Sequence, residues 1–102
     1  MSDKIADVIF TGIGAVKTDT GYTDIGNSDK VNVTLKAAGG SVDGTLKIFG
    51  KDAEGDDIFL ASEVFTEAGT TTFPLTAVGF VEVTVHVTAW VAGTFAATIN
   101  AK

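Results

Sequence analysis

The stretch that decides the fold class is residues 80–89, which read Phe80-Val81-Glu82-Val83-Thr84-Val85-His86-Val87-Thr88-Ala89. Successive side chains of a β-strand point to opposite faces, so this alternation predicts a strand with one apolar face and one polar face. After Gly93 the alternation resumes with Phe95, Ala97 and Ile99. Residues 80–101 are therefore predicted to form a β-hairpin that turns near Gly93.

The rest of the chain repeats this pattern in short segments. Further strands are predicted near residues 5–10, 22–25, 30–37, 45–49, 58–65 and 70–75. Glycine-bearing polar stretches at 39–41 and 50–57 are expected to separate them, and Pro74 indicates an edge strand or a strand end. The 15 threonines, 12 valines and 12 glycines favour strands and tight turns. We predict an all-β fold, an antiparallel β-sandwich of seven or eight strands, immunoglobulin-like or jelly-roll-like, as a single domain over residues 1–102.

Charge and composition exclude several classes of partner. The net charge is −6 and all seven basic residues are lysines, so the chain lacks the basic patch on which nucleic-acid binding depends. No apolar stretch is long enough for a membrane helix. Residues 1–4 are polar and no apolar segment follows them, which predicts synthesis in the cytoplasm without a signal peptide. The absence of cysteine excludes disulfides.

One loop carries carboxylates that a hard cation could use. Asp52, Glu54, Asp56 and Asp57 lie in a glycine-bearing segment, and oxygen ligands suit calcium. Their spacing is not that of an EF-hand, and the same residues are typical of a solvated turn. Asp19, Asp24 and Asp29 allow the same two interpretations. We expect turns rather than metal sites.

Nothing in the sequence predicts catalysis or a cofactor. His86 is the only histidine, and no nucleophile motif surrounds any serine. Four residues are instead candidates for contacts with a partner. Trp90, near the expected hairpin tip, either caps the core or anchors a partner. Tyr22 lies in a glycine-rich loop, and Thr84 and His86 lie on the polar face of the strand, which is suited to solvent or to another subunit.

Two segments carry a resemblance to a known group of proteins. They are Gly39-Gly40-Ser41-Val42-Asp43-Gly44-Thr45-Leu46 and the alternating pattern over 83–99 that contains Gly93-Thr94. They are similar to small β-sandwich virion proteins of tailed bacteriophages, although Leu46 stands where those proteins often have an aromatic residue. The resemblance implies a structural protein of the virion, such as a capsid decoration, cement, fibre-base or tail component. Its partners would be other virion proteins or further copies of itself. The alternative is a carbohydrate- or cell-surface-binding module.

Overall fold

The computed structural model describes residues 5–26 and 28–102, so the polar residues 1–4 and Asn27 lie outside it. The described chain forms β1 (Ile5–Ile13), β2 (Thr23–Asp24), β3 (Lys30–Lys51), β4 (Asp57–Phe65), β5 (Gly69–Thr76) and β6 (Glu82–Ala101). Every pairing between them is antiparallel. The prediction of an all-β antiparallel fold is confirmed. Within the described ranges no helix is long and apolar enough to cross a membrane.

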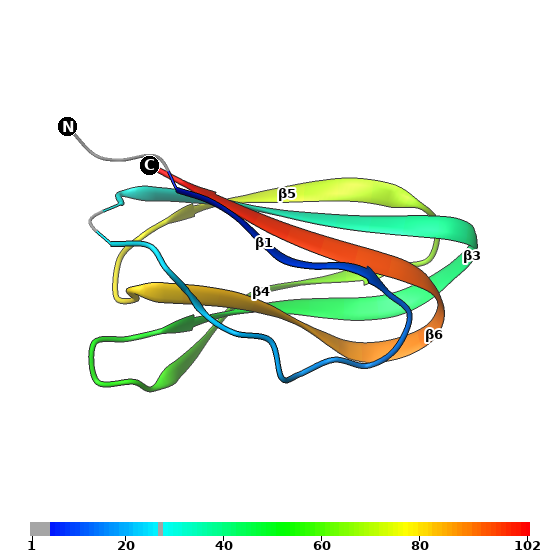
Figure 1. Cartoon of the computed structure of the whole chain (residues 1–102), viewed down its shortest axis with the longest axis horizontal. Coiled ribbons are helices and arrows are strands. Elements are labelled where there is room, and N and C mark those ends of the chain that lie inside the picture. Colours follow the sequence, from blue (N-terminus) through cyan, green and yellow to red (C-terminus); the bar gives the residue numbers. More distant parts are fainter. Residues whose placement is uncertain (1–4, 27) are drawn as a thin grey trace.

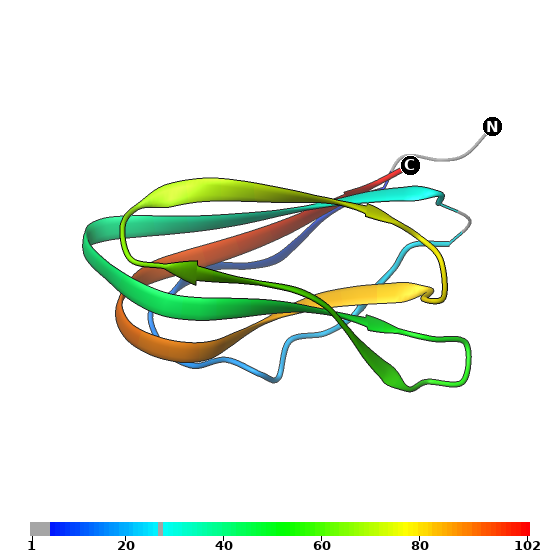
Figure 2. The same ribbon diagram turned by 180° about the vertical axis from the view of Figure 1, so that it is seen from behind.

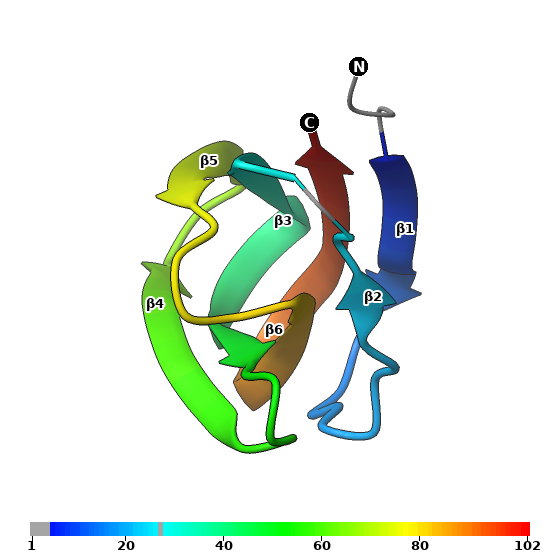
Figure 3. The ribbon, with the colours of Figure 1, turned by 90° about the vertical axis from the view of Figure 1, so that its left-hand side faces the viewer.

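All six of these strands belong to one hydrogen-bonded sheet, in which β1-β6-β3-β4 form the main path while β2 pairs with β6 and β5 pairs with β3. The two long strands, β3 and β6, lie side by side and bend together (Figure 1). The first half of the sheet contains β1, β5, residues 30–38 of β3 and residues 94–101 of β6. The second half contains β2, β4, residues 43–51 of β3 and residues 82–92 of β6. Figures 2 and 3 show the sheet curling over so that its two halves face each other.

The predicted hairpin over residues 80–101 is wrong in its pairing. Residues 82–101 form one continuous strand, β6, which bends back so that its two arms face each other, and both arms pair with β3 instead of with each other (Figure 1). The expected break at residues 39–41 is likewise a bend within β3. Gly39 and Gly93 have φ values of 131° and 93°, which favour glycine. A Cβ at Gly93 would lie 3.1 Å from the carbonyl oxygen of Ser41, so the two bends also touch closely. Each long strand replaces two predicted strands, which leaves six strands in one sheet; a sandwich of two separate sheets is not confirmed.

The core lies between the facing halves. Val83, Val85 and Val87 are fully buried, as the alternation predicts, whereas Val81 precedes β6 and is 40% exposed. The buried apolar side chains are Phe10, Ile25, Val31, Val33, Leu35, Ala37, Val42, Leu46, Ile48, Phe65, Phe80, Val83, Val85, Val87, Phe95, Ala97, Ile99 and Ala101. They come from both halves, so neither half buries its inner face alone.

Candidate interaction surface

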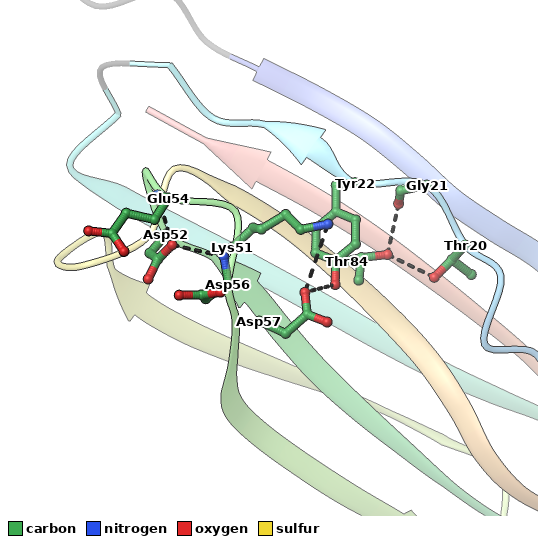
Figure 4. Close-up of polar contacts among 9 residues, drawn as sticks. All are labelled: Thr20, Gly21, Tyr22, Lys51, Asp52, Glu54, Asp56, Asp57 and Thr84. Carbon is green, nitrogen blue, oxygen red and sulfur yellow. Dashed lines mark hydrogen bonds and ion pairs between the residues drawn. The ribbon is translucent and has the colours of Figure 1, made fainter.

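The segment before β2 covers part of the outer side of the second half. Lys17 pairs with Val87 and Thr23 pairs with Val83, so this segment follows the edge of β6. Between these two points, residues 20–22 lie over Thr84, as Figure 4 shows. The Thr84 hydroxyl donates to the carbonyl oxygen of Gly21 at 2.8 Å and lies 2.8 Å from the Thr20 hydroxyl. Thr84 has no exposed surface, so the expectation that it lies on an accessible face is wrong.

Tyr22 closes this cover by reaching the β3–β4 connection. Its hydroxyl donates to Oδ1 of Asp57 at 2.6 Å, and Nζ of Lys51 lies 4.2 Å from the ring centroid. Lys51 also lies 3.9 Å from the same carboxylate oxygen. Burial and the Asp57 carboxylate raise the pKa of Tyr22 from 10.0 to about 12. Tyr22 is therefore engaged within the molecule, and the role of partner anchor remains a prediction.

Two of the four carboxylates considered as calcium ligands, those of Asp52 and Asp57, have other partners in this structure. Oδ1 of Asp52 accepts hydrogen bonds from the backbone nitrogens of Glu54 and Asp56, each at 2.9 Å, which is the pattern of a polar turn. Asp57 binds Tyr22 and Lys51. In residues 5–26 and 28–102, no three Asp, Glu, His or Cys side chains are grouped so that they could hold a metal.

The other acidic series is dispersed as well. Asp19 pairs with Lys17 at 3.0 Å, and this contact lowers the pKa of the Asp19 carboxyl. Asp24 accepts the backbone N–H of Gly26 at 2.7 Å. Asp19 thus takes part in a surface ion pair and Asp24 in a local turn.

An aromatic cluster that the sequence reasoning missed lies on the outer side of the second half. The ring of Phe49 lies 5.0 Å from that of His86 and 6.0 Å from that of Phe59, with an interplanar angle of 67° for the two phenylalanines. Phe59 and Val64 on β4 are 57% and 61% exposed. We call Phe49, Phe59, Val64 and His86 the aromatic face.

Strand alternation contained the signal for this face. Leu46 and Ile48 are predicted to point inward, so Phe49 must point outward. In the same way, Phe59 must point outward because its neighbours Ile58 and Leu60 point inward. Burial against Phe49 lowers the pKa of His86, while the charges of Asp57 and Asp19 oppose that effect. His86 is thus a partly buried member of an apolar cluster.

Trp90 lies where β6 approaches its bend. Its Nε1 donates to the carbonyl oxygen of Gly93 at 2.8 Å, and 39% of the residue is exposed. The indole therefore braces the bend and also presents surface to solvent. Both interpretations of Trp90, core cap and partner anchor, remain open.

The outer side of the first half is polar. A shallow hollow of about 640 Å³ is lined by Asp29, Lys30, Asn32, Thr34, Thr72, Asn100, Ala101 and Lys102. The hydroxyls of Thr34 and Thr72 lie 3.1 Å apart across neighbouring strands. This half thus presents amides, hydroxyls and charges where the second half presents aromatic rings.

Comparison with known proteins gives a likeness of fold. No family model matches the chain, and no curated protein matches it in sequence. The crystal structure of the SPBc2 prophage-derived protein YomS superposes with a TM-score of 0.74 at 13% identity, covering 98% of this chain and 94% of that chain. A protein from a study of Bacillus endospore appendages, a family of disulfide-linked pili, has a TM-score of 0.49 at 20% identity, with coverages of 98% and 85%. The first likeness establishes a common fold, and the second is too distant to support an argument.

Proposed function

We propose that this chain is a non-enzymatic structural or assembly protein of a tailed-phage virion, acting as a capsid decoration, cement, fibre or tail component. The observation that carries the proposal is the fold shared with a prophage-derived protein over 98% of this chain and 94% of the other. Nearly the whole of each chain takes part in the superposition. The comparison thus concerns the entire described domain rather than a common substructure.

A histidine and an aspartate that could in principle act as acid–base groups have structural partners, which supports a role without catalysis. His86 packs on Phe49, and Asp57 is held by Tyr22 and Lys51. A general base must instead be free to reach a substrate proton. We therefore propose neither a cofactor nor a reaction, and we propose other virion proteins or further copies of the chain as partners, with no role for nucleic acid or membranes.

A carbohydrate-binding module is the competing function, and the geometry of the aromatic face supports it less well. The rings of Phe49 and Phe59 meet at 67°, so they do not share a plane on which a sugar ring could stack. Exposed apolar side chains of this kind are typical of protein–protein contacts. The geometry therefore favours assembly over glycan recognition.

The virion role is tested by looking for the protein in particles. Phage particles from the host that carries the gene would be purified on a density gradient, and the protein quantified by mass spectrometry and located by immunogold labelling. We expect a fixed ratio of this protein to the major capsid or tail protein, since symmetric shells bind their components in defined numbers. Abundant protein in the lysate with none in the particles would overturn the proposal. Binding of the purified protein to a glycan array would favour the competing module.

A further inference from the structure

The outer side of the second half presents two exposed apolar side chains on one strand, which no part of the described chain covers. Val64 and Phe59 lie on β4, which is the last strand on its side of the sheet. They are 61% and 57% exposed. On β5, the corresponding outer positions are Thr70, Thr72, Pro74 and Thr76. Solvent-facing apolar residues on an edge strand favour association unless something protects them.

The charges around Val64 have a symmetric arrangement. Thr45 of β3 pairs with Val64 of β4, so these two residues form one row across the sheet. Asp43 lies two residues before Thr45 and Lys47 two residues after it, on the same outer side, because Val42, Gly44, Leu46 and Ile48 are buried. Within the described residues, neither Asp43 nor Lys47 forms an ion pair. A cation and an anion are thus placed at equal distances from the Thr45–Val64 row.

We propose that this face binds a second copy of the chain through a two-fold axis that runs along the Thr45–Val64 row. Such an axis places Lys47 of each copy opposite Asp43 of the other, because a two-fold contact brings residue i to j and j to i. It also brings the two Val64 side chains together at the centre. The pairs lie about 13 Å apart along the strand, at about 3.3 Å per residue, and facing sheets pack about 10 Å apart, within reach of a lysine.

Electrostatics favours a second copy over an unrelated acidic or basic partner. The chain carries a net charge of −6, yet Asp57, the carboxylate at the start of β4, is already paired with Lys51. Along this part of β3 there remain one positive charge, on Lys47, and one negative charge, on Asp43. Two copies of this surface, related by a two-fold axis, are therefore complementary in charge. A partner with charge of a single sign would match only one of the two.

The size of the face predicts a weak dimer. Three strands at about 4.8 Å spacing and nine residues at about 3.3 Å give a footprint of roughly 400 Å² per copy. Stable interfaces bury about 800 Å² of accessible surface per partner. We therefore expect association only at high concentration. Repeated contacts in an assembled shell would strengthen it, which gives the proposed structural role a definite contact face.

The test is the mass of the purified protein by sedimentation equilibrium, from micromolar to millimolar concentration. We expect the mass to rise from 10.5 kDa toward twice that value. Lys47→Glu makes the chain more acidic and Asp43→Lys makes it less acidic, yet each alone should abolish the rise by placing like charges opposite each other. The double variant D43K/K47E should restore the rise, which a general effect of net charge could not do.

Matched variants on the first half serve as controls. Val64→Thr should weaken association at least tenfold, whereas Val8→Thr, at a residue that is 57% exposed on β1, should leave it unchanged. Lys36→Glu, an equal change of charge at an exposed position, should also have no effect. A monomer at every concentration, or a dimer that none of the three face variants weakens, would overturn the proposed contact. Neither result bears on the presence of the protein in particles, which the virion experiment measures separately.

Discussion

The two halves of the sheet have similar inner sides and very different outer sides. The first half presents threonines, asparagines and lysines to solvent, including Thr34, Asn32 and Asn100. The second half is covered near Thr84 by residues 20–22 and also presents the rings of Phe49 and Phe59 on its outer side. A polar face that contacts only water tolerates substitution of its side chains. A face that is covered by another segment, or that is apolar, depends on the particular side chains that it carries. This difference is the reason why we propose the second half, and not the first, as the contact face.

The largest effect should come from glycines on the inner side of the second half. A Cβ at Gly44 would lie 2.5 Å from Cζ of Phe95 and 3.1 Å from the carbonyl oxygen of Ala89. Gly44→Ala should therefore lower the free energy of unfolding by roughly 1–3 kcal/mol through overpacking. Urea denaturation followed by tryptophan fluorescence measures this change.

Gly40 in the bend provides the control, because no atom lies within 4 Å of a Cβ built there. Gly40→Ala should leave stability unchanged or raise it by less than about 1 kcal/mol. If Gly44→Ala and Gly40→Ala lowered the free energy of unfolding equally, the ring of Phe95 would not need the space that Gly44 leaves open.

The covered and open outer sides can be compared at two threonines. Thr84→Val removes a buried hydroxyl that binds Gly21 and Thr20, and should lower the free energy of unfolding by roughly 1–2 kcal/mol. Thr34→Val removes the 3.1 Å contact with Thr72 on the open side, and should change the free energy of unfolding by less than about 0.5 kcal/mol. Thermal unfolding of both variants measures these changes. If Thr84→Val and Thr34→Val lowered the stability equally, residues 20–22 would not form a stable cover over Thr84.

A smaller effect concerns the tyrosine that fastens the cover. Tyr22 is the only tyrosine, so the absorbance of tyrosinate reports its pKa, which should be about 12 in the folded protein. Between pH 10.0 and about 12 the unfolded chain loses this proton while the folded chain keeps it, so the free energy of unfolding should fall as pH rises through that window.

Asp57→Asn removes the carboxylate that accepts the tyrosine proton. The titration midpoint should move down toward 10.0 while the fold persists. Asp56→Asn, in the same loop but not bonded to Tyr22, should leave the midpoint in place. An unchanged midpoint in Asp57→Asn would contradict the Tyr22–Asp57 contact.

Local alternation was sufficient to determine the strand class and the inward residues. Val83, Val85 and Val87 are buried because a period of two fixes the side of each residue once one face is apolar. The same rule places Phe49 and Phe59 outside, although sequence reasoning did not use it for them. The polar turn at Asp52 likewise follows from residue type alone.

The fold of the sheet and the contents of its outer side were decided by tertiary structure. Nothing in the sequence near Gly39 or Gly93 distinguishes a bend from a turn, because both need a glycine with positive φ. A bend forms instead of a hairpin turn because β3 and β6 pair with each other on both sides of it. The burial of Thr84 depends in the same way on Thr20 and Gly21, more than 60 residues away in the chain. Alternation determines which side of a strand a residue occupies, but only long-range pairing determines what covers that side.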